Sequence, residues 1–197
     1  IADVPGVRGS RLPAGRAITP GELGAMMRAC TTDRTDAGAR DAAIIALGYA
    51  GGLRRAELAA LQLEDLAADD GEQITIRVLG KGGKERAIYL DNGGADALRG
   101  WLKVRGTEPG ALFYAGRRGG HLQRGHGMTP QAIRDVVARR AEQAGVAHTS
   151  THDLRRSFVS DLLDAGTDIA TVASMAGHAN IATTQRYDRR GEGAKKR

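Results

Sequence analysis

The chain has 197 residues, and its 29 Lys and Arg against 23 Asp and Glu give a formal net charge of +6. Cys30 is the single cysteine, which excludes an internal disulfide framework and a zinc cage built from cysteines. The hydrophobic content of 41% is too high for an intrinsically disordered protein, and no apolar run reaches the roughly 18 residues of a membrane span. We therefore expect a soluble globular protein whose positive charge favours an acidic partner.

Helical patterns dominate the first third of the chain. Residues 1–18 are rich in Gly, Pro and Arg and are expected to be the remnant of a linker. Thr19-Pro20-Gly21-Glu22 combines a capping residue, a proline in the first turn and a capping-box glutamate, and so predicts a helix start. The first three helices are expected over about 19–30, over 36–51 and from Leu53 onward, where Leu58, Leu61 and Leu63 can pack inward.

The spacing of apolar residues changes to a period of two between residues 73 and 90. This alternation, broken by a glycine-rich stretch around Gly82, predicts a β-hairpin with lysines at its tip. Beyond it we expect a short strand at 112–114, a loop at 116–128, and helices over about 92–104, 129–144, 150–165, 168–176 and 180–187. The fold class is therefore mainly α with a small antiparallel β-hairpin or sheet, an α+β arrangement, and residues 191–197 are expected to form a mobile basic tail.

Four separated segments carry unusual polar groups. They are Gly52-Leu53-Arg54-Arg55-Ala56-Glu57-Leu58, Gly80-Lys81-Gly82-Gly83-Lys84-Glu85-Arg86, His152-Asp153-Leu154-Arg155-Arg156-Ser157-Phe158, and Gly177-His178 followed by Tyr187 nine residues after His178. Taken singly each is weak, because an arginine near a helix start is usually solvated and a glycine-rich lysine turn is usually only a hairpin. Four such motifs in one order are far less frequent by chance than any one of them.

In this order and at these spacings, the motifs resemble the catalytic domain of the tyrosine recombinases, the phage integrase family, from about residue 17 to 190. The resemblance implies the catalytic-domain fold of that family over residues 19–190, with the family's N-terminal DNA-clamping domain outside this stretch. It implies a site-specific recombinase that cleaves and rejoins DNA through a 3′-phosphotyrosine, without metal, ATP or another cofactor. The catalytic residues that it implies are Arg54, Glu57, Lys81, His152, Arg155, His178 and Tyr187. Arg55 stands where members often carry a small or apolar residue, so the choice of Arg54 rests on the motif register.

The chemistry of phosphoryl transfer agrees with these residue types. Negative charge grows on the non-bridging phosphate oxygens in the transition state, and the planar guanidinium groups of Arg54 and Arg155 can each hold two such oxygens. The resemblance assigns attack to Tyr187 and protonation of the departing 5′ oxygen to Lys81, whereas Lys84 at the same hairpin tip is the competing candidate. No dense carboxylate cluster stands ready for paired Mg²⁺ ions, so we expect no metal.

Other basic residues are candidates for contacts with the DNA backbone. The stretch from 117 to 140 holds six Arg and one Asp, and a second basic run begins at 186. The candidates are Arg55, Lys84, Arg117, Arg118, Arg124, Arg134, Arg156 and Arg186. The alternative is that these residues form only a solvated basic surface without contact to DNA.

The expected partner is double-stranded DNA with specific recombination sites, and no membrane. By itself this fragment is expected to be monomeric, and the resemblance implies a tetramer on paired sites. The resemblance also implies a cytoplasmic protein that acts at the nucleoid and is encoded by a prokaryote or a phage. A type IB topoisomerase and a catalytically silent DNA-binding regulator of the same fold remain alternatives. Phage, transposon, integron and chromosome-resolution origins are all compatible with the sequence.

Overall fold

The computed structural model describes residues 15–80, 82–117, 119 and 121–188. Its helices and strands are α1 (Pro20–Thr31), α2 (Asp36–Ala50), α3 (Arg55–Ala60), the 3-10 turn η1 (Leu63–Asp65), β1 (Leu66–Asp69), β2 (Ile74–Leu79), β3 (Glu85–Leu90), α4 (Asn92–Arg105), β4 (Tyr114–Gly116), β5 (Leu122–Gly127), α5 (Pro130–Gln143), α6 (Thr151–Asp164), α7 (Ile169–Ala176) and α8 (Ile181–Gln185). The predicted fold class, mainly α with a small antiparallel sheet, is confirmed. In the described ranges no helix is long and apolar enough to cross a membrane.

Helix α2 lies at the centre of the main hydrophobic core. Its residues Ile44, Ile45 and Leu47 are fully buried, as expected for a helix whose apolar residues occupy most of its circumference. Trp101 on α4 packs into the same core, and its indole N–H donates to the Leu112 carbonyl at 2.9 Å. Burial of this apolar surface is the main source of the fold's stability.

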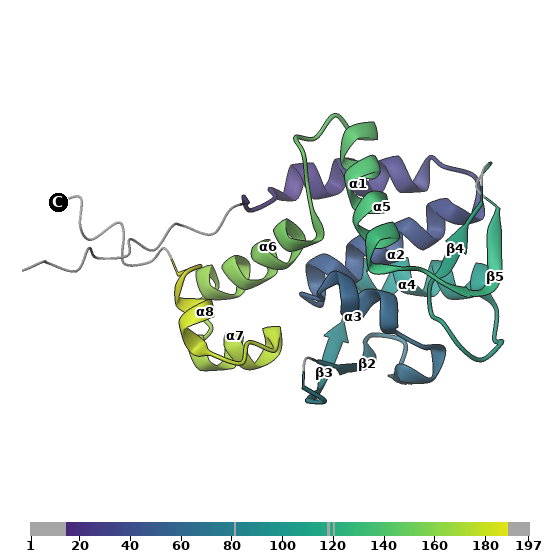
Figure 1. Ribbon diagram of the computed structural model, residues 1–197. Coiled ribbons are helices and arrows are strands. Elements are labelled where there is room, and N and C mark those ends of the chain that lie inside the picture. Colours follow the sequence, from purple (N-terminus) through teal and green to yellow (C-terminus); the bar gives the residue numbers. More distant parts are fainter. Residues whose placement is uncertain (1–14, 81, 118, 120, 189–197) are drawn as a thin grey trace, which may run out of the picture.

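A second, smaller core joins α6, α7 and Tyr187, which follows α8, and these three helices lie together at one end of the molecule (Figure 1). It contains Phe158, Val172 and Tyr187, whereas Leu154, one turn earlier on α6, belongs to the main core. Helix α6 therefore connects the two cores. The packing of these three helices therefore positions Tyr187 in the second core.

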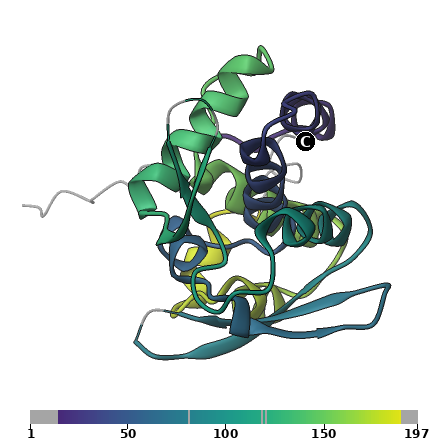
Figure 2. The ribbon, with the colours of Figure 1, turned by 90° about the vertical axis from the view of Figure 1, so that its right-hand side faces the viewer.

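The sheet of β1, β2 and β3 is antiparallel and extends along the lower edge of the view in Figure 2. In β2 the residues Ile74, Ile76 and Val78 are buried in strict alternation, as the period of two predicts. The sequence did not predict β1, because Leu66-Ala67-Ala68-Asp69 has no β-branched residue and no alternation.

The expectation of a loop at 116–128 is wrong in part, and the neighbouring strand lies two residues later than predicted. Strand β4 spans Tyr114–Gly116 and pairs with β5, Leu122–Gly127, in a second antiparallel hairpin. The residues of β5 are exposed or half-buried, so the strand is held by backbone pairing and leaves no pattern in the side chains.

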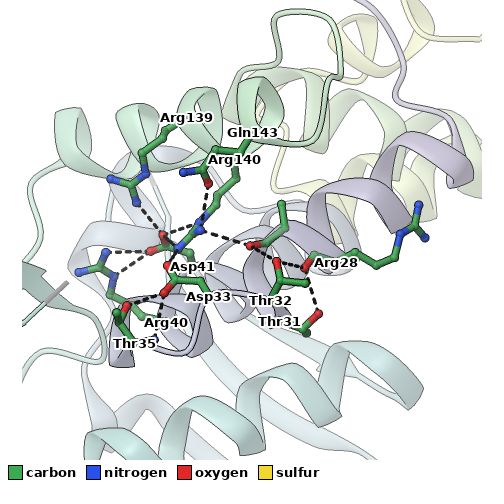
Figure 3. Close-up of polar contacts among 11 residues, drawn as sticks. Arg28, Thr31, Thr32, Asp33, Thr35, Arg40, Asp41, Arg139, Arg140 and Gln143 are labelled. Carbon is green, nitrogen blue, oxygen red and sulfur yellow. Dashed lines mark hydrogen bonds and ion pairs between the residues drawn. The ribbon is translucent and has the colours of Figure 1, made fainter. Parts of the chain in front are cut away.

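Three arginines surround the fully buried carboxylate of Asp41 on α2 (Figure 3). Arg40 and Arg140 contact it at 2.8 Å and Arg139 at 2.7 Å, and Arg140 also pairs with Asp33 at 2.6 Å. The network ties α5 to α2 and to the α1–α2 loop. Two of the six arginines expected to form a DNA-gripping surface between 117 and 140 are thus engaged in holding the fold.

Candidate active site

A pocket of about 430 Å³ opens where the start of α3, the start of α6 and the α7–α8 region meet. Its lining is strongly cationic and comes from segments far apart in the sequence. The lining residues are Arg54, Arg55, Arg134, Ser150, Thr151, His152, Arg155, His178, Thr183 and Tyr187. The structure thus brings together five of the seven residues to which the sequence assigns catalysis.

Arg54 is the N-cap of α3, just outside the helix. Its backbone N–H donates to Glu57 Oε2 at 2.9 Å, and its Nη1 donates to Glu57 Oε1 at 2.7 Å. Its Nη2 donates to the Gly177 carbonyl at 2.7 Å. Both ends of the guanidinium are held, so the side chain keeps a fixed direction at the pocket wall.

Glu57 lies under the pocket and is 6% exposed. A second arginine, Arg86 on β3, grips the same carboxylate with Nη1 at 3.1 Å and Nη2 at 2.8 Å. Burial by itself would raise the pKa of the Glu57 carboxyl, but the hydrogen bonds and charge of Arg86 and Arg54 outweigh it and lower the pKa to about 2. Glu57 is therefore ionised and connects the hairpin to the N-terminus of α3.

Arg86 ends one of the four segments that carry unusual polar groups, but the sequence gives it no role. It belongs to an alternating strand, and its partner Glu57 precedes it by 29 residues, so no local spacing reveals the pair. A Cβ on Gly177 would stand only 3.0 Å from Arg86 Nη1, which places the guanidinium between Glu57 and the Gly177 turn. Gly177 adopts φ +63, a conformation that suits glycine.

Arg155 on α6 is 4% exposed, yet it lines the pocket. Its Nη1 donates to the Gly52 carbonyl at 2.6 Å, whereas its buried Nη2 has no hydrogen-bond partner among the described residues. Burial, and then the charge of Arg54, lower the pKa of Arg155 to about 10, so it remains a cation at neutral pH. A buried cationic donor without a partner is costly, and an anion in the pocket would satisfy it.

Tyr187 is 7% exposed and follows α8. Its phenolic oxygen lies 3.3 Å from Nε2 of His152, and its ring stacks on His178 with centroids 6.1 Å apart. The guanidinium carbon of Arg156 lies over the Tyr187 ring, 5.1 Å from its centroid. The phenol is thus oriented toward His152 within a cationic environment.

Both histidines of the pocket favour the neutral form. Desolvation and the charge of Arg156 lower the pKa of His152, and Arg155 adds to this against the opposing charge of Asp153. Desolvation followed by the charges of Arg155 and Arg54 lowers the pKa of His178 to about 4. A neutral His152 can accept the Tyr187 proton at its Nε2 atom.

Thr184 is a further site residue that the sequence did not single out. It is fully buried on α8, and its Oγ1 lies 2.7 Å from Nδ1 of His178. The sequence holds Thr184 three residues before Tyr187, but nothing in the sequence shows that α8 turns its hydroxyl toward the histidine.

The remaining predicted residues lie in several different places. Lys81 and Arg118 fall outside the described residues, as does the tail 191–197. Arg55 and Arg134 line the pocket and are exposed, and Lys84, Arg117 and Arg186 are exposed elsewhere. Arg124 donates to the Arg105 carbonyl at 2.7 Å and the Val104 carbonyl at 3.1 Å, and Arg156 is buried against Tyr187. Both therefore have contacts within the fold, and their contact with DNA stays a prediction.

No three His, Cys, Asp or Glu side chains within the described ranges cluster as metal ligands.

Comparison with known proteins shows the family to which this chain belongs. The model of the phage integrase family matches residues 16–192, and the chain belongs to that family. The chain is 39% identical over 168 residues to the tyrosine recombinase XerC of Corynebacterium efficiens, covering 84% of the chain and 51% of the relative. It is 40% identical over 162 residues to XerC of Chromohalobacter salexigens, covering 80% of the chain and 50% of that relative.

Solved structures agree with the fold. The XerH site-specific recombinase in a post-cleavage complex with palindromic difH substrate superposes with a TM-score of 0.74 at 26% identity, covering 95% of this chain and 54% of that one. The XerA recombinase superposes with a TM-score of 0.73 at 24% identity, over 95% of this chain and 65% of that one, and shares the fold. The expected catalytic-domain fold is confirmed. The chain spans about half the length of the curated relatives it matches.

Proposed function

We propose that this chain is the catalytic part of a site-specific DNA recombinase, which cuts and rejoins DNA strands through a 3′-phosphotyrosine on Tyr187. The observation that carries the proposal is the buried Nη2 of Arg155, which lines the cationic pocket and lacks a partner among the described residues. A non-bridging phosphate oxygen supplies the charge and the acceptor that this donor needs. Arg54 across the pocket would hold the same phosphate.

The attack step follows from the contact between Tyr187 and His152. The phenolic oxygen forms a bond to the scissile phosphorus while its proton passes to Nε2 of His152, 3.3 Å away. The charge that grows on the non-bridging oxygens is stabilised by Arg155 and Arg54, with His178 beside them. These groups together provide the stabilisation, so the proposal requires no metal ion.

The bond from phosphorus to the 5′ oxygen then breaks, and that oxygen takes a proton from the Lys81 ammonium. The phosphotyrosyl ester preserves the energy of the broken phosphodiester, so no ATP is needed for resealing. A 5′ hydroxyl from another duplex then attacks the phosphorus and gives its proton to the neutral Lys81 amine, while Tyr187 leaves with the proton returned by His152. The product is an exchanged strand.

We extend the proposal to the whole protein. Residues 19–190 are its catalytic domain, preceded by a linker and a DNA-clamping domain, which agrees with relatives of which this chain matches about half the length. Its partner is double-stranded DNA carrying recombination sites, as for the XerH complex with difH substrate. The protein would work in the cytoplasm at the nucleoid, as a monomer when free and as a tetramer on paired sites.

The test uses the full-length protein and a nicked substrate that carries its recombination site and loses the 5′ hydroxyl fragment after cleavage. The wild type should accumulate a covalent DNA adduct in EDTA, whereas Tyr187→Phe should bind the DNA equally well and form none. Absence of the adduct with wild-type protein on bound substrate would refute the proposal and favour a silent DNA-binding regulator. Efficient relaxation of a supercoiled plasmid that lacks the site would favour a topoisomerase instead.

A further inference from the structure

The contact between Thr184 and His178 determines which ring nitrogen of the histidine carries its proton. Thr184 Oγ1 lies 2.7 Å from Nδ1, and the threonine side chain has no exposed surface. A hydrogen bond at this distance has one donor and one acceptor, and either atom can take either role until the protons are assigned.

His178 is neutral near pH 7, since burial and the charges of Arg155 and Arg54 bring its pKa to about 4. A neutral imidazole has one N–H and one bare nitrogen. If the proton is on Nδ1, the Nε2 atom is a bare acceptor. If the proton is on Nε2, the ring presents a donor there and accepts at Nδ1.

The hydroxyl proton of Thr184 decides between the two forms. The hydroxyl is sealed from solvent, and among the described residues Nδ1 of His178 is its one hydrogen-bond partner. If Nδ1 carried the proton, the threonine O–H would point at no acceptor, and burying a donor without a partner is unfavourable. If Thr184 donates to Nδ1, the buried hydroxyl proton has an acceptor, and the imidazole N–H at Nε2 stays available for a ligand.

We propose that Thr184 is a positioning residue that holds His178 in the Nε2–H form, so that the ring presents a hydrogen-bond donor at Nε2 beside Arg155. The use of that donor, a non-bridging oxygen of the scissile phosphate, rests on the proposed function. The assignment of the proton does not, because it follows from the free protein. Thr184 itself touches no substrate.

The first measurement is made on the full-length protein without DNA. Long-range ¹⁵N–¹H correlation spectra at pH 7 report which ring nitrogen of His178 is protonated, and the resonance is assigned by its loss in His178→Gln. We expect Nε2–H in the wild type and in Thr184→Ser, which keeps the hydroxyl, and a mixture of both forms in Thr184→Val. A wild-type ring protonated at Nδ1, or a Thr184→Val ring unchanged from the wild type, would overturn the proposal.

The second measurement is the rate of adduct formation at saturating DNA. Thr184→Val should be slower by about tenfold, less than the 10²–10³-fold loss typical of removing a charge-stabilising donor outright, with DNA affinity unchanged. Thr184→Ser should regain most of the rate.

The matched control is Thr149→Val. Thr149 is equally buried, and its hydroxyl donates to the Ala147 carbonyl at 2.8 Å, so its loss reports the general cost of a missing buried hydroxyl. We expect this variant to cleave at the wild-type rate and Thr184→Val to be slower at the same thermal stability. An equal rate loss in both variants would reduce Thr184 to a structural role. A wild-type protein that has the Nε2–H form but forms no adduct would refute the proposed function and leave the proton assignment intact.

Discussion

At the scale of single residues, the pocket combines permanent cations with neutral imidazoles. Arg155 stays charged at neutral pH, and the charges of Arg155 and Arg54 contribute to keeping His178 neutral. A phosphate that enters therefore meets donors and cations, while His152 remains free to accept a proton. Because the pKa values of both histidines are lowered, the stability of the fold and the rate of cleavage should both decrease at acidic pH.

The pH dependence of cleavage tests His152 as the base. Its pKa lies below the ordinary 6.5, so the wild-type rate should be flat from pH 8 to 6.5 and should fall at lower pH, with a slope that approaches tenfold per unit. Single-turnover rates at saturating DNA measure this. His152→Gln should remove the slope, and a wild-type rate that rises on acidification would contradict the assignment.

The stability of the free protein should carry the signature of His178. In the unfolded chain its pKa is the ordinary 6.5, and in the folded chain it is about 4, so the unfolded state binds more protons between these values. The contribution of His178 to the free energy of unfolding is therefore present above pH 6.5, decreases down to about pH 4, and is constant below. Urea unfolding of the wild type and His178→Gln between pH 7 and 4 should show a shallower decline in the variant.

Removing the Glu57 carboxylate should destabilise the fold. Its side chain is 5% exposed and that of Arg86 is 12% exposed, so Glu57→Ala leaves a largely buried cation without its counter-ion. We expect a loss of about 3 kcal/mol in the free energy of unfolding, measured with urea. Glu72→Ala in the exposed β1–β2 turn is the control and should change it by less than about 0.5 kcal/mol. A similar small effect for both would contradict the buried network.

At the scale of elements, the turn between α7 and α8 connects backbone conformation to the site. Gly177 ends α7 with φ +63, and a Cβ there would stand 3.0 Å from Arg86 Nη1, so the guanidinium would have to shift. Gly177→Ala should cost about 1–2 kcal/mol through its backbone conformation and should also slow cleavage, because Arg86 and the carbonyl that holds Arg54 must move.

Gly166 provides the comparison for this prediction. It has φ +88 after α6, and no atom would stand within 4 Å of an added Cβ. Gly166→Ala should lose similar stability but cleave at the wild-type rate. Equal cleavage by the two alanine variants would show that the Arg86 contact does not matter for the site.

Some elements and contacts are specified by neighbouring residues and can be predicted from the sequence, whereas others depend on distant residues. Helices such as α1, with its Thr19 cap and Glu22, are specified by neighbouring residues, and their ends fall within one or two positions of the prediction. Strand β5 pairs with β4 and shows no alternation of buried residues, and the Arg86–Glu57 and Thr184–His178 contacts depend on packing of separate elements. Such contacts leave no local pattern, whereas the motif residues around the pocket do.

At the scale of the whole molecule, a second charge network stabilises the fold away from the site. The Asp41 cluster joins α2 to α5 and the α1–α2 loop, and none of its ion-pair partners lines the cationic pocket. Asp41→Asn should therefore cost about 3–5 kcal/mol in the free energy of unfolding, because Arg140 stays buried beside a weaker partner.

Cleavage by Asp41→Asn should be normal for the fraction of molecules that remains folded, as measured by adduct yield corrected for the folded fraction. Asp135→Asn, which breaks an exposed ion pair with Arg134, should cost less than about 1 kcal/mol. If Asp41→Asn had the free energy of unfolding of the wild type, the buried cluster would not be what stabilises the contact between α2 and α5.

The most direct test of the central claim is to locate the covalent bond to DNA. Adduct trapped on the nicked substrate is digested with protease and nuclease, and mass spectrometry identifies the tyrosine that carries the nucleotide. The account predicts a single modified site, Tyr187, and its loss in Tyr187→Phe. A nucleotide on Tyr49, Tyr89 or Tyr114 would contradict it, since none of these three tyrosines lines the cationic pocket.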